Sequence, residues 1–274
     1  MNFNYNTLQV TLQKETRSIN VALNRPENQN RINIEMLFEL EGLFGWLTSH
    51  LEVNAVVLTG TGEFFSAGFD QDELAIMSEE KMQKYMVRFQ KLISGMLCLP
   101  QTIICDLKEG CSGMGMELAL GADIRLGRTT CKVSFDSLNK GWVPCAGGIG
   151  LLSLWSGHAT ARNWTMTSKT VSSEDLFNNS FLNEVYSTSE NATDNALQRI
   201  LAQAPVARIQ AKRAFLEAIM PELTRSFEFE SIFSFSAMKT EDWKKNPTEN
   251  PDESFTAARE LAEALKSKSP EMTV

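Results

Sequence analysis

Histidine and positive charge are both scarce in this chain of 274 residues. The two histidines, His50 and His158, are too few for a histidine-rich metal site. The formal net charge of −8 and the isoelectric point near 5.0 argue against nonspecific binding of nucleic acid. No apolar run reaches the roughly 18 residues that a transmembrane helix needs. We therefore expect no metal, no nucleic-acid partner and no membrane partner.

Cysteine pairing and targeting signals are also lacking. The five cysteines are odd in number and show no C-x-x-C spacing, which suits a reducing compartment better than a disulfide scaffold. Residues Met1 to Asn6 lack the charged and then apolar pattern of a secretory signal peptide. We therefore expect a cytoplasmic protein. Its 43% hydrophobic and 22% charged residues are typical of a globular chain that buries a core, in one domain or two.

Hydrophobic periodicity predicts an α/β protein. Alternating polar and apolar residues predict half-buried strands, short apolar runs predict buried strands, and helical spacing predicts amphipathic helices between them. Strands that alternate with helices favour a mostly parallel sheet with right-handed crossovers. The predicted strands are Thr7–Leu12, Ser18–Leu23, Ala55–Thr59 and Thr102–Leu107, and the predicted helices are Ile34–Leu47 and Lys81–Leu97, the second with Ser78 as its N-cap.

The C-terminal third is predicted to be helical from Asn191 onward. Pro205 and Pro221 suit helix starts, so we predict that they separate consecutive helices. A polar loop is predicted to precede a last helix. The predicted helices are Ala192–Gln203, Val206–Met220, Phe227–Lys239 and Glu253–Lys266.

The most informative stretch is the glycine-rich turn Gly110–Ala119, which carries Glu117. Glycines let a backbone approach a ligand closely, and a helix N-terminus presents free N–H groups to negative charge. A carboxylate in the first helical turn would place one acid/base group beside one oxyanion donor. Taken alone, the segment is equally compatible with a tight turn and a solvent-facing glutamate.

Three motifs, in order, resemble those of the crotonase (enoyl-CoA hydratase/isomerase) superfamily. They are Leu23–Asn33, Gly60–Asp70 and Gly110–Asp123, which match L-N-R-P-x-x-x-N-A-L, T-G-x-G with F-x-A-G-x-D, and G-G-G-x-E-L-A-L with A-x-D. The resemblance runs from about Leu8 to about Tyr186 and is loose beyond that point.

That resemblance implies an α/β fold with two regions. Residues 1–190 would form a crotonase-like ββα spiral that holds the acyl-CoA site. Residues 191–274 would form a helical C-terminal region that contacts neighbouring subunits and covers the pocket. The implied assembly is a homotrimer or hexamer, and the alternative is that these helices complete the core of a monomer.

The resemblance also implies an oxyanion hole for an acyl-CoA thioester. Its two backbone donors fall on the N–H groups of Phe69 and Met114, and such donors stabilise an enolate at the thioester carbonyl. The family usually has small residues at both positions, so these side chains would narrow or redirect the pocket. No cofactor is implied other than coenzyme A as part of the substrate. The coenzyme A path falls on Arg31, Ile32, Ala67, Gly68, Phe69 and Asp70.

One departure from the family pattern lies in Val133–Pro144. Glu117 matches the first catalytic glutamate of hydratases, but Ser137 stands where the second belongs and Asp136 where a proline belongs. Hydration needs one group to position water and another to deliver a proton, and serine is a poor general acid. Asp136 replaces the missing acid only if the local backbone turns it inward. Some members of the family have an aspartate at the position of Cys145.

Other polar residues are more readily explained by structure than by chemistry. A nucleophilic Cys145 competes with simple packing, and Ser66 and Ser137 have no histidine near them in sequence for a serine hydrolase. Gly147–Gly150 matches a helix-opening turn of the family and lacks the βαβ unit of a dinucleotide site. Expected structural residues are Asp123 as an anchor for a turn or salt bridge, His50 as a helix C-terminal cap, His158 in a helix, and Trp142 in the core or pocket wall.

The leading interpretation is an enzyme that acts on an acyl-CoA thioester with Glu117 as acid/base. The contrasting class is a non-catalytic protein that binds acyl-CoA, or an acyl group on a carrier, with the same fold. Within the enzyme class, isomerisation, decarboxylation and thioester hydrolysis compete with hydration, because each could proceed with one carboxylate.

Overall fold

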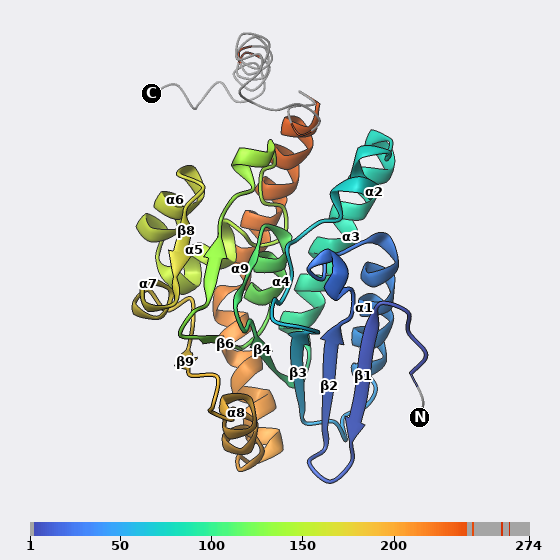
Figure 1. Cartoon of the computed structure of the whole chain (residues 1–274), viewed down its shortest axis with the longest axis vertical. Helices are drawn as coiled ribbons and strands as arrows, with labels where there is room; N and C mark the ends of the chain where they lie inside the picture. The colour runs from blue at the N-terminus through green and yellow to red at the C-terminus, as the bar shows by residue number, and fades with distance from the viewer. Residues whose placement is uncertain (1–2, 240–242, 244–258, 260–262, 264–274) are drawn as a thin grey trace.

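The computed structural model describes residues 3–239 together with Trp243, Arg259 and Glu263. The predicted helix Glu253–Lys266 lies outside the described residues except at two isolated positions. Figure 1 shows a sheet at the centre, with long helices running beside it and along the long axis of the molecule.

A large sheet of six described strands confirms the predicted α/β class. Its order is β1-β2-β3-β4-β6-β9, with an antiparallel hairpin of β1 and β2 at one edge and parallel pairing across the rest. The strands at its centre are buried on both faces, as continuous apolar runs predict. The bounds are β1 Leu8–Gln13, β2 Ser18–Leu23, β3 Ala55–Gly60, β4 Thr102–Asp106, β6 Ile124–Arg128 and β9 Glu184–Tyr186.

A second, three-stranded sheet gives the chain its ββα repeat. Its order is β5-β7-β8, with β5 parallel to β7 and β7 antiparallel to β8. The chain passes from β4 to β5 and then into a helix, and from β6 to β7 and then into further helices. Successive turns therefore add one strand to each sheet before a helix. The bounds are β5 Gly110–Ser112, β7 Lys132–Ser134 and β8 Thr170–Ser172.

Helices α1 and α3 pack against each other and contribute many residues to the main core. Helix α1, Ile34–Leu47, begins where Asn33 accepts the N–H of Met36 at 2.9 Å. Helix α3, Glu79–Cys98, begins at the predicted cap, Ser78, which accepts the N–H of Lys81 at 3.4 Å. The remaining short elements are η1 Pro26–Asn28, α2 Gln71–Ala75, α4 Met114–Leu120, η2 Leu138–Lys140, α5 Gly150–Ser156, α6 His158–Met166, α7 Ser173–Asn178 and α8 Ala192–Leu201.

The prediction of a helix break at Pro221 is wrong. One helix, α9, runs from Pro205 to Met238 with Pro221 inside it, and Figure 1 shows it along the long axis of the molecule. A proline inside a helix removes one hydrogen bond and typically costs about 3 kcal/mol. Apolar side chains on both sides of the proline pack against the core, and this packing holds the helix continuous. They are Leu216 and Ile219 before it and Leu223 and Phe227 after it.

Candidate active site

A small cavity brings together residues that lie far apart in the sequence. It holds about 30 Å³ of free space, which is room for little more than one water molecule. Segments after β3, after β5, and between β7 and α5 supply most of its wall, and α3 supplies the rest. The lining residues are Ala67, Phe69, Gln71, Met86, Gly113, Met114, Glu117, Ser137, Lys140, Trp142, Val143 and Cys145.

Glu117 lies in the first turn of α4 with its side chain inside the protein. Only 1% of its surface is exposed. Its Oε2 accepts the N–H of Cys145 at 3.0 Å and the N–H of Ala146 at 2.5 Å. Burial raises the pKa of Glu117 to about 8, and the nearby charge of Glu230 adds to this effect. The carboxyl group is therefore buried rather than solvent-facing, and its pKa lies near neutral pH.

Two backbone N–H groups have no hydrogen-bond acceptor within the described part of the chain. Ile32 donates to the carbonyl of Gly68 at 2.7 Å and accepts from Asp70 at 3.1 Å. The carbonyl of Gly68 and the N–H of Phe69 belong to one trans peptide group and point in opposite directions, so the N–H of Phe69 faces away from Ile32. The N–H of Met114 is a free donor at the start of α4. Both N–H groups are thus available to an oxyanion.

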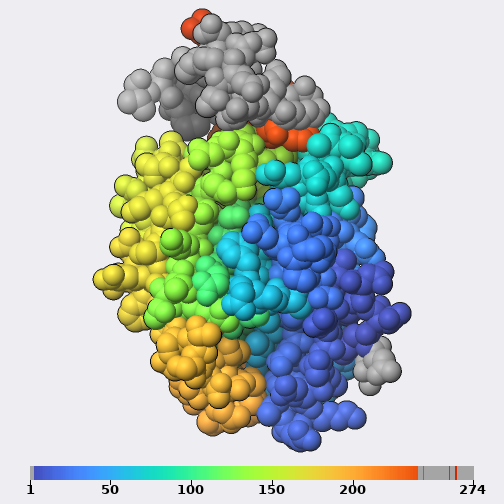
Figure 2. Space-filling view, viewed as in Figure 1, coloured from blue at the N-terminus to red at the C-terminus, as the bar shows by residue number. Residues whose placement is uncertain are grey.

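Gly68 lets the two segments approach each other. Its φ of +88° favours glycine, and a Cβ there would lie 3.1 Å from the nitrogen of Met114 and 3.0 Å from the carbonyl oxygen of Ser112. The segment after β3 therefore lies directly against the N-terminus of α4. In Figure 2 this segment, drawn in cyan, lies between the blue N-terminal residues and the green residues around β5.

Aromatic side chains line the cavity and pack against one another. The ring of Phe69 lies 4.9 Å from that of Tyr85 and 6.0 Å from that of Trp142, between centroids. Trp142 in turn packs against Trp243 at 5.1 Å. A groove of about 550 Å³ adjoins the cavity beyond Trp142, and the two share Gln71, Lys140 and Trp142 in their walls.

The position of the missing second glutamate holds no buried acid. Ser137 is buried and lines the cavity. Asp136 is not one of the lining residues, and its Oδ2 forms an ion pair with Lys140 at 2.7 Å. The other oxygen, Oδ1, is buried with no partner among the described residues, on the side of Gly113. Asp136 is thus neutralised by a cation beside the cavity.

Glu230 is a functional candidate that sequence reasoning missed. It lies on α9 with only 3% of its surface exposed. It accepts the N–H groups of Gly147 at 2.6 Å, Gly150 at 2.7 Å and Ile149 at 3.3 Å. Burial raises its pKa to about 7. The sequence did carry a signal, because Glu230 shares one helical face with four buried residues, Leu223, Phe227, Ser234 and Met238.

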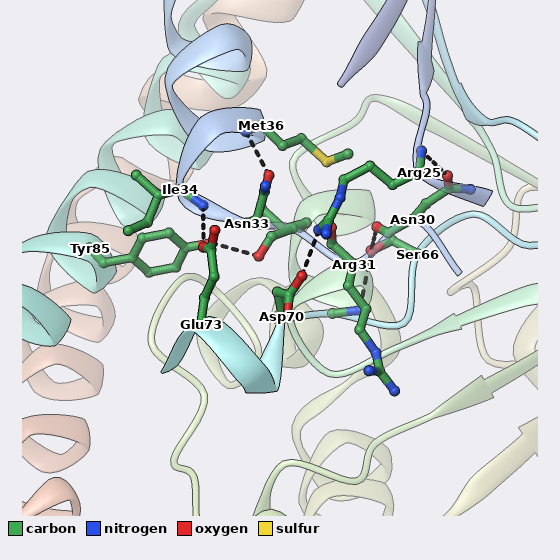
Figure 3. A network of polar contacts seen from close by, with 12 residues as sticks. Arg25, Asn30, Arg31, Asn33, Ile34, Met36, Ser66, Asp70, Glu73 and Tyr85 are labelled. Atoms are coloured by element: carbon green, nitrogen blue, oxygen red, sulfur yellow. Dashed lines mark hydrogen bonds and ion pairs between the residues drawn. The ribbon is translucent and has the colours of Figure 1, made fainter. Parts of the chain in front are cut away.

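The predicted coenzyme A path is divided between the cavity and a structural network (Figure 3). Ala67 and Phe69 line the cavity. Asp70 is buried and pairs with Arg25 at 2.7 Å, and Arg25 also donates to the carbonyl of Arg31 at 2.8 Å. The side chain of Arg31 points away from this network. The carbonyl of the buried Ile32 accepts the hydroxyl of Tyr85 at 3.0 Å.

Several residues have the structural roles that the sequence predicts. Asp123 accepts the N–H of Ile103 and the ammonium of Lys212, each at 2.7 Å. His50 caps α1 through a hydrogen bond of 2.8 Å between its Nδ1 and the carbonyl of Trp46. Cys145 is buried, and burial together with the two glutamates raises its thiol pKa well above the usual value. A protonated thiol is a weak nucleophile.

Comparisons with known proteins identify the family of the chain. A family model described as enoyl-CoA hydratase/isomerase matches residues 14–260. The short-chain-enoyl-CoA hydratase of Clostridium acetobutylicum is 28% identical over 238 residues, which are 86% of this chain and 91% of that protein. The mitochondrial Δ(3,5)-Δ(2,4)-dienoyl-CoA isomerase of Mus musculus is 23% identical, over 87% of this chain and 77% of that protein.

Solved structures show the same fold. An enoyl-CoA hydratase/isomerase from Mycobacterium paratuberculosis gives a TM-score of 0.83 at 20% identity, over 90% of this chain and 100% of that one. The crotonase fold predicted from the motifs is thereby confirmed. The chain belongs to the enoyl-CoA hydratase/isomerase family.

Two features are absent from the described residues. They contain no group of three or more histidine, cysteine, aspartate or glutamate side chains placed to hold a metal ion. None of their helices combines the length and apolarity needed to cross a bilayer.

Proposed function

We propose that the protein binds an acyl-CoA thioester and transfers a proton at its α-carbon through an enolate. The observation that carries this proposal is one cavity lined by a buried glutamate, Glu117, and by the residues of two free N–H donors, Phe69 and Met114. Preorganised donors of this kind stabilise the negative charge that develops on the thioester oxygen. Coenzyme A would enter as part of the substrate, along Arg31 and Ala67, and no other cofactor is required.

The raised pKa of Glu117 suits proton transfer in either direction. A carboxyl group with a pKa of about 8 is mostly protonated at pH 7, so it can deliver a proton to the α-carbon of an enolate. The ionised fraction grows as the pH approaches 8, and in that form the group can remove the same proton. Because Glu117 is buried, neither form is screened by bulk water.

A reaction that needs one carboxylate is favoured over ordinary hydration. Water addition by two glutamates requires an acid at Ser137, and the nearby Asp136 is paired with Lys140. Migration of a double bond requires only that one group remove and return a proton. The named relatives include both a hydratase and a dienoyl-CoA isomerase, so the family name alone does not decide between these reactions.

A second candidate function is binding of acyl-CoA, or of an acyl group on a carrier, without turnover. The size of the cavity favours it, because about 30 Å³ between Phe69, Met114 and Trp142 is far less than a thioester occupies. A catalytic complex would require these side chains to move toward the adjoining groove of about 550 Å³. Calorimetry separates both candidates from a protein that binds no acyl-CoA.

The experiment that tests the leading function compares crotonyl-CoA with a 3-enoyl-CoA as substrates. We expect slow or no hydration of the first and faster isomerisation of the second. The variant Glu117→Gln should lose the isomerisation, and Glu52→Gln, which changes an exposed glutamate, should keep it. Tight binding of both substrates without turnover of either would favour the non-catalytic candidate. No binding of either at millimolar concentration would contradict both candidate functions.

We further propose that the protein assembles as a homotrimer or hexamer. Large apolar side chains are exposed along α9, among them Phe215 with 78% of its surface exposed and Val206 with 71%. Exposed apolar surface of this kind marks a surface of association. Light scattering tests the proposal, since a mass near that of one 30.6 kDa chain at micromolar concentration would contradict it.

A further inference from the structure

The segment that follows Pro144 and runs into the first residue of α5 holds two carboxyl groups from distant parts of the chain. Five of its backbone N–H groups donate hydrogen bonds to glutamate side chains. Cys145 and Ala146 donate to Glu117, at 3.0 Å and 2.5 Å. The other three, Gly147, Ile149 and Gly150, donate to Glu230. We call residues 145–150 the amide loop.

Glycines in the amide loop make room for both carboxyl groups. A Cβ on Gly148 would lie 3.2 Å from the carboxyl carbon of Glu117 and 2.5 Å from the Cβ of Pro144. A Cβ on Gly150 would collide with the hydroxyl of Ser226, one turn before Glu230 on α9. Side chains at these positions would therefore push α4 and α9 away from the loop.

We infer that Glu230 is a positioning residue for Glu117, and that the two carboxyl groups form one acid–base unit on the amide loop. The inference deepens the proposed function and rests on its claim that Glu117 transfers the proton. Glu230 would act through the loop and through its charge, without touching the substrate. The C-terminal helix α9 would thereby set the protonation state of the active site.

No cation neutralises the unit within the described residues. Neither Glu117 nor Glu230 forms an ion pair there, and the ammonium of Lys140, which lines the same cavity, is paired with Asp136. Two negative charges held by amides alone repel each other, so ionisation of one carboxyl group disfavours ionisation of the other. The pair should release its two protons in separate steps that belong to the unit rather than to either residue.

The other titratable groups that face the unit stay neutral or are already paired. Burial raises the pKa of the Cys145 thiol on the loop and of the Tyr85 hydroxyl on α3 well above their usual values. On the remaining side, Lys140 and Asp136 neutralise each other. The charge on Glu230 is therefore the main titrating influence on Glu117 near pH 7.

A second link fixes the loop to α9 and α3. The side-chain amide of Gln90 on α3 donates to the carbonyl of Cys145 at 2.7 Å and to the carbonyl of Phe227 at 2.9 Å. Ser231 donates to the side-chain carbonyl of Gln90 at 3.2 Å. Because of this link, the loop keeps its anchorage when the charge of Glu230 alone is removed. A variant at Glu230 therefore tests charge more than folding.

The test follows the protonation of Glu117 by carboxyl-carbon NMR of protein labelled in its glutamate side chains, with Glu117→Gln used for assignment. In Glu230→Gln we expect the midpoint of Glu117 to fall by about one pH unit, because a like charge has been removed. Glu228→Gln changes an exposed glutamate two residues away on the same helix and should leave the midpoint unchanged. An unchanged midpoint in Glu230→Gln would overturn the inference and leave Glu230 as a structural anchor.

Two further measurements keep the test decisive. If Glu230→Gln fails to fold, the wild-type titration decides, since the unit predicts two steps in the Glu117 signal and an isolated carboxyl group predicts one. With a turned-over substrate, Glu230→Gln should lower the pH midpoint of kcat and leave KM within about twofold. Unchanged turnover in Glu117→Gln would contradict the proposed function. The NMR titration needs no substrate, so it tests the acid–base unit independently of that result.

Discussion

The two sides of the small cavity hold their charges in opposite ways. On one side, Glu117 is held by backbone N–H groups of the amide loop and has no cationic partner among the described residues. On the other side, Asp136 is paired with Lys140, which is one of the lining residues of the cavity. Both sides place a carboxyl group near the same space. Burial on the first side raises the pKa of Glu117 to about 8.

This difference supports the proposed proton transfer at Glu117. An ion pair with lysine favours the ionised carboxylate, whereas burial without a cation favours the protonated acid. The carboxyl group of Glu117 on the amide loop is therefore the group that we propose exchanges a proton. Ser137 supplies a neutral hydroxyl beside the ion pair of Asp136 and Lys140. By the motif resemblance, a two-glutamate hydratase has an acid at this position.

Loss of the carboxyl group on the amide-loop side should have the largest effect. Glu117→Gln keeps the shape of the side chain but removes the exchangeable proton, and loss of such a group typically costs about 10²–10⁴-fold in rate. Stopped-flow or steady-state turnover of an identified acyl-CoA substrate measures it, with binding checked by calorimetry. Unchanged turnover would move the chemistry to the opposite side, where Asp136 is the next residue to test.

Glu117, which has no cationic partner among the described residues, should also make the protein less stable as the pH rises. The pKa of Glu117 is raised in the folded state to about 8, so its contribution is fully present below the ordinary value near 4.5 and is lost as the pH rises through 8. Relative to Glu117→Gln, we expect the wild-type protein to lose about 2–4 kcal/mol of unfolding free energy between pH 5 and pH 8. Urea unfolding of both proteins at each pH measures this difference. If the unfolding free energies of the two proteins changed with pH in parallel, burial would not disfavour the ionised form of Glu117.

An acid placed on the opposite side should make the two sides more alike. Ser137→Glu introduces the second carboxyl group of a hydratase, and we expect hydration of crotonyl-CoA to rise by about tenfold or more. Ser137→Gln has a similar size without the acid and should not restore hydration. Fast hydration by the wild-type protein would contradict the account, because it would require an acid other than the serine.

Breaking the salt bridge should have the smallest effect. Lys140→Met removes the partner of Asp136, but both side chains are partly exposed and ion pairs of this kind contribute about 0–1 kcal/mol. The free energy of unfolding from urea titrations should therefore change little, whereas Glu117→Gln in the same assay should alter its pH dependence. A loss of more than about 2 kcal/mol would show that the Asp136 side is as tightly organised as the amide loop.

The sequence predicted best those features that depend on local pattern. Helix α1 occupies the predicted range Ile34–Leu47, and strand β2 the predicted range Ser18–Leu23, because capping and periodicity are both encoded within a few residues. Glu117 was found through its glycine-rich turn and its ordered motifs. Its burial was not predicted, since that depends on the amide loop folding over it.

The features that were missed depend on contacts between distant segments. The helix was predicted to break at Pro221 because local rules count the lost hydrogen bond but not the packing on both sides of it. That break also concealed the buried stripe of α9, in which Glu230 replaces an apolar residue. The N–H of Gly147 donates to the carboxylate of Glu230, which lies 83 residues further along the chain. The proposed boundary near residue 190 and the assembly state stay predictions.

The most direct test of the central claim is exchange of the α-protons of a saturated acyl-CoA with deuterium oxide, followed by proton NMR. Exchange requires an enolate and a proton-transferring group, and it does not depend on whether the natural reaction is isomerisation, decarboxylation or hydration. The proposed role of Glu117 predicts exchange with the wild-type protein and with Glu228→Gln, and its loss by about 10²-fold or more in Glu117→Gln. No exchange with the wild-type protein despite binding, or equal exchange in Glu117→Gln, would contradict it.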